Sequence, residues 1–334
     1  MERVRPAVTP VVSPTVLAIL GPTASGKSAL GLAVAEHYGG EIINCDSTAV
    51  YRGFDIGTDK VALADRRGIP HHLIDIADPT EVYTAAQFAR DAAAVIRSLH
   101  ARGRLPILVG GTGFYYRALT RGLFPGPGAD EALRSRLNLI AVRRGPERLH
   151  RLLRRVDPVS AERIMPRDQQ RLVRALEVYL ITGRPLTAHF ADTASPIADC
   201  EVIALALQIP AALTAERVRR RVEDQFSRGI VAEVTGLLAR GVPPTARPFG
   251  GLVYRQVMEM LRGVRGEVDT RALIAQENRR YARRQLIWFR KEPNLTWLDG
   301  PGERVEWREV ETLLVARGLP PGNTSWGTQQ GEAL

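Results

Sequence analysis

Residues 16–28 read VLAILGPTASGKS, an apolar run that leads directly into a glycine-rich turn. The run at 16–20 is typical of a buried strand, and the pattern after Lys27 predicts a helix to about Tyr38. A Gly-x-x-x-x-Gly-Lys-Ser turn between a strand and a helix fits a phosphate-binding P-loop. Successive backbone N–H groups of such a turn face one anion, and the helix N-terminus adds its positive dipole end. The stretch therefore predicts a site for a di- or triphosphate group.

Two side chains of this turn have expected tasks. Lys27 supplies a point charge to the terminal phosphate, and the Ser28 hydroxyl is a typical Mg²⁺ ligand beside the phosphates. The competing interpretation, a glycine-rich turn with a solvated lysine, fits the strand–turn–helix context poorly. The residues expected to bind the diphosphate are Gly21, Pro22, Thr23, Ala24, Ser25, Gly26, Lys27 and Ser28.

Strands and helices alternate along the rest of the chain. Apolar runs predict further strands at 41–45, 72–75, 106–110, 202–207 and 296–298. Helical spacing predicts helices at 84–102, with Thr84 as N-cap, and at 215–228, 231–240 and 270–289. Strands that are apolar on both faces indicate a parallel sheet covered by helices on both sides. The predicted fold class is therefore α/β, with a sheet like that of P-loop NTPases.

The alternation stops at residues 124–128, Phe-Pro-Gly-Pro-Gly, which are typical of a linker. Only helical patterns follow, to about Phe190, before the next strand-like run. An inserted all-helical domain is therefore expected within one α/β core. In chain order we expect an N-terminal extension (1–14), a core in two parts (15–128 and 197–319) that flank the insertion (129–196), and a disordered tail (320–334).

Composition narrows the class of protein. The formal net charge is +10, carried almost wholly by arginine, which favours a polyanionic partner. No apolar stretch reaches membrane-spanning length, and the N-terminal residues lack the pattern of a secretory signal. Cys45 and Cys200 are too few and too distant to indicate a disulfide framework or a zinc site. We expect a cytoplasmic, monomeric protein with no membrane contact.

Arginine gathers in two segments outside the phosphate-binding turn. One covers residues 134–174, and the other covers residues 279–291, where Tyr281, Trp288 and Phe289 are interleaved. Guanidinium groups suit phosphates, and aromatic rings can stack on unpaired bases. The alternative is solvated helix faces, with some arginines paired to Glu147, Asp157 or Glu162. We favour contact with RNA.

Two polar residues follow predicted strands at the edge that also carries the P-loop. Asp46 follows the strand at 41–45, and Thr112 follows the strand at 106–110 within Gly-Gly-Thr-Gly. In open α/β sheets this edge faces the ligand crevice. Asp46 could bind Mg²⁺ or accept a proton, or it could equally be an N-cap. Thr112 could donate a hydrogen bond to a ligand, or belong only to a tight turn.

Residues 15–298 resemble the tRNA dimethylallyltransferase family, because many ordered stretches match it. These are GPTASGKS (21–28), DSTAVY (46–51), DIGT (55–58), GIPHHLID (68–75), GGTG (110–113), QRLVRALEV (170–178), YRQ (254–256) and YARRQLIWFR (281–290). Val61 and Ile287 depart from the usual pattern, which commonly has proline and threonine at these places. Neither position has an expected catalytic task.

The resemblance implies transfer of a dimethylallyl group from dimethylallyl diphosphate to the exocyclic N6 amine of the adenosine 3′-adjacent to the tRNA anticodon, with release of diphosphate. It implies Asp46 as general base, Lys27 and Arg221 on the diphosphate, Thr112 as a donor near that group, and Mg²⁺ as cofactor on Ser28. The residues expected against a tRNA anticodon stem-loop are Asp46, Ser47, Thr48, Ala49, Thr112, Arg134, Gln170, Arg171, Leu172, Val173, Arg174, Arg280, Arg283 and Arg284.

Two other functions remain open from the sequence. A prenyltransferase acting on free adenine nucleotides would share the P-loop, Asp46 and Thr112, but it needs no arginine-rich surface. An RNA-binding P-loop NTPase would instead hydrolyse ATP. His71 and His72 have no cysteine or third histidine near them in sequence, so we expect packing or hydrogen bonding and no metal.

Overall fold

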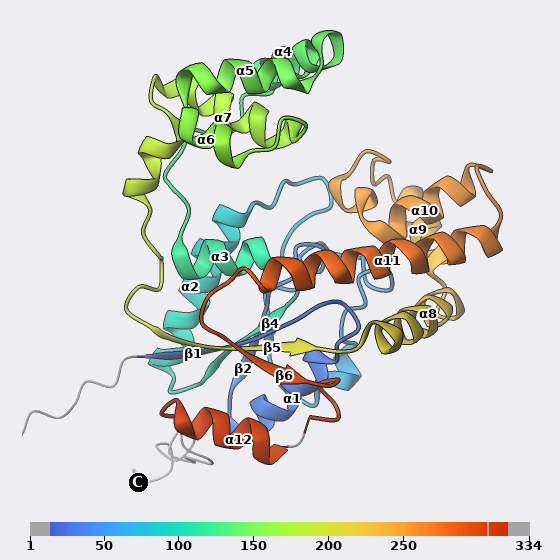
Figure 1. The fold of residues 1–334 in the computed structure, drawn as a ribbon. Helices are drawn as coiled ribbons and strands as arrows, with labels where there is room; N and C mark the ends of the chain where they lie inside the picture. Colours follow the sequence, from blue (N-terminus) through green and yellow to red (C-terminus); the bar gives the residue numbers. More distant parts are fainter. Residues whose placement is uncertain (1–13, 306, 320–334) are drawn as a thin grey trace, which may run out of the picture. The chain divides into compact units, whose positions relative to one another are not determined.

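The structure is a computed structural model that describes residues 14–305 and 307–319. The tail expected at 320–334 and nearly all of the expected N-terminal extension lie outside these residues. The chain divides into two compact units (Figure 1). The first runs to Thr120 and resumes at Ile197, and the second is Arg121–Pro196.

The first unit is built on a six-stranded sheet of order β3-β2-β4-β1-β5-β6, and every pair of neighbours is parallel. This confirms the predicted parallel α/β sheet. In the register, Leu20 at the end of β1 lies opposite Gly110 of β4 and Ala206 of β5. The P-loop and the turn after β4 therefore leave the sheet at the same edge. The strands are β1 (Thr15–Leu20), β2 (Glu41–Asn44), β3 (His71–His72), β4 (Pro106–Gly110), β5 (Glu201–Gln208) and β6 (Leu295–Asp299).

The strand predicted at 72–75 is wrong in its extent. β3 ends at His72, because Leu73 and Asp75 adopt left-handed backbone angles, with φ of 61° and 57°. A chain with two such residues cannot continue as an extended strand. The other predicted strands are confirmed to within two residues at each end.

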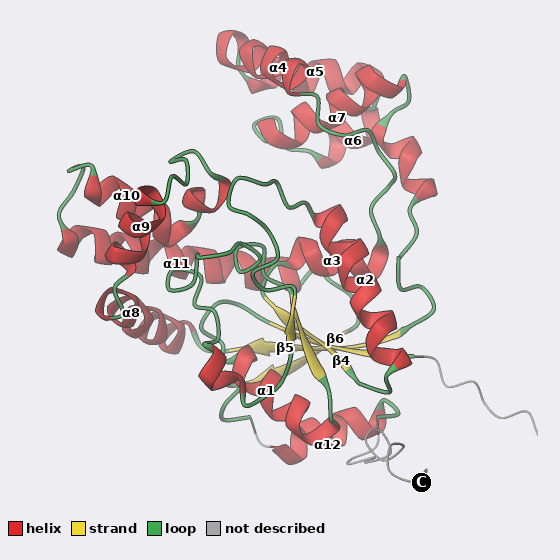
Figure 2. Ribbon diagram, turned by 180° about the vertical axis from the view of Figure 1, so that it is seen from behind, coloured by secondary structure: helices red, strands yellow, loops and turns green. Residues whose placement is uncertain are grey.

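Helices cover both faces of the sheet. Figure 2 shows α1 and α12 on one side of the sheet and α2 and α3 on the other. The predicted helices are confirmed, whereas α10 and α12 were not predicted, since both are short and α10 begins at a glycine without a side-chain cap. The helices of this unit are α1 (Lys27–Tyr38), α2 (Ala85–Ala101), α3 (Gly113–Arg121), α8 (Ala211–Ser227), α9 (Ile230–Ala239), α10 (Leu252–Leu261), α11 (Glu267–Phe289) and α12 (Trp307–Ala316), with 3₁₀ turns η1 (Leu63–Arg66) and η3 (Arg247–Gly250).

The start of α2 shows the predicted cap. The Thr84 hydroxyl accepts a hydrogen bond from the Gln87 N–H (3.2 Å), and the Gln87 side chain accepts one from the Thr84 N–H (2.8 Å). This reciprocal arrangement is a capping box, which satisfies two N–H groups at the helix N-terminus. Thr84 is therefore confirmed as the N-cap.

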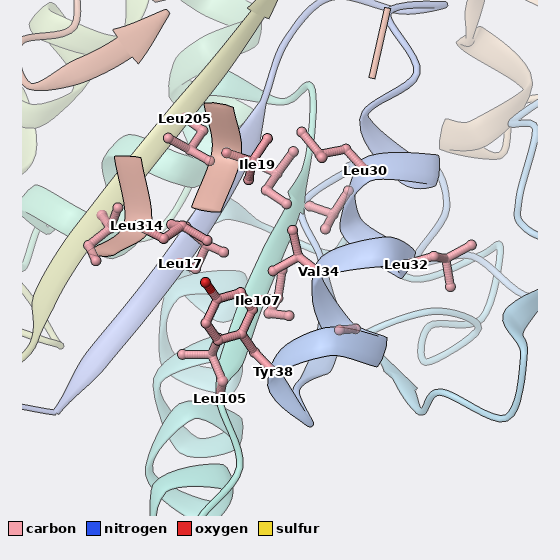
Figure 3. Packing of buried hydrophobic residues seen from close by; sticks show 14 of the residues in the cluster. Leu17, Ile19, Leu30, Leu32, Val34, Tyr38, Leu105, Ile107, Leu205 and Leu314 are labelled. Carbon is pink, nitrogen blue, oxygen red and sulfur yellow. The ribbon is translucent and has the colours of Figure 1, made fainter. Parts of the chain in front are cut away.

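The core on the α1 face joins distant parts of the chain (Figure 3). Leu17 and Ile19 of β1 pack with Val34 of α1 and Leu314 of α12, and all four side chains are buried. Burying such side chains is the main favourable term in folding. This packing holds β1 and the start of α1, and therefore the P-loop between them, in a fixed geometry.

The second unit is all-helical, as its sequence pattern predicts. It consists of α4 (Glu131–Arg144), α5 (Pro146–Val156), α6 (Pro158–Arg163), α7 (Gln169–Thr182) and the 3₁₀ turn η2 (Leu186–Asp192). Leu137, Leu153 and Leu172 form part of its core. The expected linker belongs to this unit, since the Phe124 ring lies 5.4 Å from the ring of His189.

Gly110 allows β4 to approach the end of β2 closely. A Cβ at this position would lie 2.1 Å from the carbonyl oxygen of Cys45, so the two backbones would have to separate. We expect Gly110→Ala to lower the free energy of unfolding by about 1–3 kcal/mol, the usual cost of overpacking. Thermal unfolding measures it. Gly250→Ala, where a Cβ meets nothing within 4 Å, is the matched control. Equal stability of the two variants would contradict the close approach.

Candidate active site

A pocket of about 520 Å³ lies at the carboxyl edge of the sheet in the first unit. This is a typical volume for a small-molecule site. Its lining comes from the phosphate turn, from Asp46 in the turn after β2, and from helices α8, α10 and α11. Among the predicted site residues, those that line it are Thr23, Ala24, Gly26, Lys27, Ser28, Asp46, Thr48, Ala49, Arg221 and Arg284.

The turn between β1 and α1 has the geometry of an anion cradle. Ala24 and Gly26 adopt left-handed angles, with φ of 62° and 82°. A left-handed alanine is strained, and such strain is typical of functional sites. Gly26 is the N-cap of α1 and has no side chain to bind the first N–H groups of the helix. Within the described residues, the buried Ser25 hydroxyl also has no hydrogen-bond partner. The turn therefore presents several unused donors at one place.

Lys27 lies within this cradle. Its ammonium donates a hydrogen bond to the carbonyl oxygen of Pro22 (3.2 Å). Burial, and then the nearby charge of Arg221, lowers the pKa of Lys27 to about 8, although Asp46, Asp59 and Cys45 act in the opposite direction. The lowered pKa means that the protein alone does not fully compensate the positive charge. A bound anion would supply that compensation.

Arg221 of α8 lies against the phosphate turn, as expected for a phosphate ligand. Its Nη1 donates to the Thr23 hydroxyl (2.8 Å), and its Nε pairs with the Asp59 carboxylate (3.1 Å). Arg217, one helical turn earlier, was not predicted as a site residue, but its Nε donates to the Ala24 carbonyl oxygen (2.7 Å). The i, i+4 spacing places both arginines on one helix face, and this signal could have revealed Arg217.

Asp46 stabilises a turn and also lines the pocket, and its expected role as general base stays a prediction. Its Oδ1 accepts hydrogen bonds from the Thr48 N–H (2.8 Å) and the Thr48 hydroxyl (2.6 Å), which stabilises the turn after β2. The residue also lines the pocket, where Tyr281 of α11 lies. Burial, and then the charge of Asp46, raises the pKa of Tyr281, which keeps the phenol neutral. A fixed carboxylate therefore faces the same pocket as the phosphate turn.

Thr112 joins two strand ends. Its Oγ1 accepts a hydrogen bond from the Ser47 N–H (3.1 Å), and its N–H donates to the Cys45 carbonyl oxygen (3.1 Å). The structure thus gives it the tight-turn role, and it is not among the described residues that line the pocket. Its expected contact with the diphosphate stays a prediction.

Gln285 of α11 is a site residue that the sequence analysis missed. Its Oε1 accepts from the Thr23 N–H (2.8 Å), and its Nε2 donates to the Gly111 carbonyl oxygen (2.8 Å). The side chain is only 6% exposed. It therefore ties the phosphate turn to the turn after β4. A glutamine on the buried face of an arginine-rich helix was the available signal.

The arginines of the two arginine-rich segments lie in different surroundings. On α11, Arg284 lines the pocket, and Arg280 and Arg283 are exposed. In the second unit, Arg134 and Arg174 instead hydrogen-bond to Glu177, whose carboxylate is fully buried (2.8 and 2.6 Å). Part of the expected RNA-binding charge therefore stabilises the helical unit.

Two expected tRNA contacts in α7 are corrected. Leu172 and Val173 are 0% and 5% exposed and pack in the core of the second unit, so their side chains cannot reach an RNA. Gln170 and Arg171 are exposed there, and their contact with tRNA stays a prediction.

The alternative partners proposed for the arginines have different outcomes. Glu147 pairs with Arg167 (3.2 Å), as expected. Asp157 instead accepts hydrogen bonds from the Ser160 N–H (3.0 Å) and the Thr187 hydroxyl (2.9 Å), which fixes the start of α6.

The histidines have hydrogen-bonding roles, as expected. His72 lies 2.7 Å from the Glu41 carboxylate, and His71 lies 2.9 Å from the Ile69 carbonyl oxygen. Within residues 14–305 and 307–319, no three His, Cys, Asp or Glu side chains come together as a metal site. In the same part of the chain, no helix combines the length and apolar character needed to cross a membrane.

Comparison with known proteins gives consistent matches. A family model described as IPP transferase matches residues 49–292. The tRNA dimethylallyltransferase of Solibacter usitatus is 48% identical over 91% of this chain and 98% of its own length. That of Geobacter metallireducens is 46% identical over 85% of this chain and 92% of its own length.

Solved structures match as well. A full-length tRNA isopentenylpyrophosphate transferase from Bacillus halodurans has 34% identity and a TM-score of 0.67, with 92% of this chain and 96% of that chain covered. A eukaryotic dimethylallyltransferase acting on tRNA has 26% identity and a TM-score of 0.72, with 92% and 78% covered.

The Gln285 bridge can be tested by a substitution of similar volume. We expect Gln285→Met to lower the free energy of unfolding by about 1–3 kcal/mol for each buried backbone group left unpaired. Gln285→Glu should also destabilise, because a second carboxylate oxygen would then face the Gly111 carbonyl oxygen without a donor between them. Chemical unfolding measures both variants, with the exposed Ile287→Met as control. If Gln285→Met unfolds like the wild type, the bridge does not hold the turn.

Proposed function

Since the chain belongs to the IPP transferase family and transfers a dimethylallyl group to tRNA, we propose that its pocket binds dimethylallyl diphosphate with the diphosphate on the phosphate turn. The observation that carries this proposal is the incompletely compensated positive charge of Lys27 beside Arg221 and the N-terminus of α1, whose N-cap residue makes no side-chain hydrogen bond. A diphosphate ester presents the same oxygens to such a turn as a nucleotide does.

The apolar part of the pocket suits the other end of this donor. Ile42, Val61, Ile74, Val109 and Leu252 contribute to the lining. A five-carbon prenyl chain gains free energy when such surface is removed from water. The combination of a cationic cradle and an apolar wall supports a prenyl diphosphate over a nucleoside triphosphate.

The acceptor is proposed to be the N6 amine of the adenosine 3′-adjacent to the anticodon. This amine forms a bond to the prenyl carbon, the carbon–oxygen bond breaks, and diphosphate leaves with the electron pair. Asp46 takes the proton that the nitrogen loses. Because Thr48 holds Oδ1, the other carboxylate oxygen is the proposed proton acceptor. Lys27 and Arg221 stabilise the charge that grows on the leaving oxygens.

Mg²⁺ is the proposed cofactor. Ser28 is exposed and lines the pocket beside Lys27, so its hydroxyl fits as one ligand. The described residues offer no cluster of three carboxylate, histidine or cysteine ligands, so the donor's phosphate oxygens would complete the coordination. When bound there, Mg²⁺ would supply electrostatic stabilisation of the leaving group.

The exposed arginines of α11 are proposed to bind the anticodon stem-loop. Arg284 lies at the pocket, and Arg280 and Arg283 continue along the exposed surface of the helix. An adenine can reach an enclosed pocket only if it leaves its stack, and phosphate contacts would hold the loop while it does so.

The proposed place of action is the cytoplasm, where tRNA is modified. The monomeric state stays a prediction.

One experiment separates the three candidate functions. The protein is incubated with Mg²⁺ and labelled dimethylallyl diphosphate, and either unmodified tRNA or AMP is offered as acceptor. The proposal expects label in tRNA and none in AMP. Label in AMP would favour the free-nucleotide prenyltransferase, and RNA-stimulated ATP hydrolysis without transfer would favour the NTPase.

Donor affinity should depend on pH through Lys27. The lowered pKa of about 8 leaves Lys27 largely neutral above that pH in the free protein. A bound diphosphate favours the charged form, so affinity should be highest below pH 8 and fall as pH rises through it. Titration calorimetry with dimethylallyl diphosphate between about pH 7 and pH 9.5 measures this. Lys27→Met should bind more weakly at every pH, without the fall. The same fall in Lys27→Met would assign it to another group.

Asp46→Asn separates proton transfer from binding. Asparagine keeps the size of the side chain and can still accept from Thr48, but it cannot take the proton. We expect single-turnover transfer to slow by about 10²–10⁴-fold, while binding of tRNA and donor changes much less. Thermal stability should stay near that of the wild type, because asparagine caps turns nearly as well as aspartate. Transfer within a few-fold of the wild type at saturating Mg²⁺ would exclude the general-base role.

A further inference from the structure

One carboxylate accepts hydrogen bonds from three backbone N–H groups of the loop at residues 55–59. Glu233 of α9 accepts hydrogen bonds from the backbone N–H groups of Asp55 (3.1 Å) and Ile56 (2.8 Å) through Oε2. Its Oε1 accepts a longer one from the Gly57 N–H (3.5 Å). Three consecutive N–H groups that face one carboxylate form a small anion-binding nest, here occupied by a side chain.

Two other helices complete this clamp. The Tyr254 hydroxyl of α10 donates to Glu233 Oε1 (2.6 Å) and accepts from the Gly57 N–H (3.1 Å). Gln225 of α8 is 1% exposed, and its amide donates to the carbonyl oxygens of Ile56 and Gly57 (3.2 and 3.3 Å). Helices α8, α9, α10 and α11 lie together in Figure 1. Both N–H groups and carbonyl oxygens of the loop are therefore hydrogen-bonded to side chains of these helices.

The clamped loop ends against the phosphate-binding arginine. Asp59 adopts a left-handed backbone angle (φ 57°), and its carboxylate forms an ion pair with the Arg221 Nε (3.1 Å). The Thr58 carbonyl oxygen lies 3.5 Å from Nη2 of the same guanidinium. Nη1 then donates to Thr23 in the phosphate turn. Hydrogen bonds to Glu233, the backbone of the loop, and the contacts of Thr58 and Asp59 thus connect Glu233 to Arg221.

Arg221 needs these contacts to stay at the phosphate turn. Its guanidinium lies near the ammonium of Lys27, and the two charges repel each other, as the lowered pKa of Lys27 indicates. A long, flexible side chain in this situation gains entropy and loses repulsion when it turns toward solvent. Asp59 opposes this movement only if its own backbone stays in place. The position of the 55–59 loop therefore decides whether the guanidinium faces the cradle.

We infer that Glu233, together with Tyr254, is a positioning residue for the donor diphosphate: it fixes the 55–59 loop so that Asp59 and Thr58 hold Arg221 against the phosphate turn. This inference rests on the proposed function, in which the diphosphate lies on that turn. A carboxylate suits the task because its two oxygens accept from both the loop and Tyr254, whereas an amide offers one acceptor oxygen.

The first test is the steady-state kinetics of Glu233→Gln with dimethylallyl diphosphate and tRNA. We expect KM for the donor to rise about tenfold, while KM for tRNA changes less than about threefold. Tyr254→Phe should act in the same direction with a smaller effect. Glu309→Gln, an exposed glutamate of α12, is the matched control and should match the wild type. An unchanged donor KM in Glu233→Gln, with only a lowered melting temperature, would mean that Glu233 merely stabilises the fold.

A double-mutant cycle shows whether Glu233 acts through Arg221. In an Arg221→Lys background the guanidinium is gone, so Glu233→Gln should raise the donor KM by less than about threefold. If the two effects multiply, the inference is overturned. Should Glu233→Gln fail to fold, Tyr254→Phe takes its place in the same cycle with the same two outcomes.

Lys27→Ala distinguishes failure of this inference from failure of the proposed function. If Lys27→Ala leaves the donor KM unchanged, the donor does not bind at the phosphate turn and both fail. If Lys27→Ala raises the donor KM but Glu233→Gln and Tyr254→Phe do not, only the positioning role is wrong.

Discussion

Two cations, Lys27 and Arg221, lie against one glycine-rich turn and repel each other. This repulsion is the constraint on which the arrangement of the rest of the site depends. Each would be more stable in water than beside the other in a partly buried pocket. The fold therefore has to hold the turn, the lysine and the arginine in place before a diphosphate binds. In the proposed function, a diphosphate that enters would find its hydrogen-bond donors already oriented, so that no reorganisation would be needed at that moment.

The parts of the first unit that hold this arrangement come from far along the chain. The sheet fixes where β1 ends, Gln285 of α11 holds the Thr23 N–H, and Glu233 and Tyr254 hold the loop that supports Arg221. Each contact pairs a buried or partly buried polar group with a matched partner, as such groups require. In the proposed function, binding of the donor therefore depends on helices α8 to α11 as well as on the P-loop.

The sequence allowed the sheet, most helices, the cap at Thr84 and the phosphate turn to be predicted, because each depends on residues close together in the chain. Gln285 and Glu233 could not be found in this way. Gln285 bonds to a residue 262 positions away, and Glu233 to a loop 176–178 positions away, and no local pattern encodes such pairings. The same limit explains Leu172 and Val173: family resemblance marked their stretch as an RNA contact, but only the packed structure shows that their side chains face the core.

The most direct test is an NMR titration of the lysine side chains. The chain contains only three lysines, Lys27, Lys60 and Lys291, so their ¹³Cε signals can be assigned by single substitutions. In the free protein Lys27 should titrate with a pKa of about 8, and saturating dimethylallyl diphosphate should raise that pKa. If the Lys27 titration is the same with and without the donor, the diphosphate does not bind at the phosphate turn and the account is wrong.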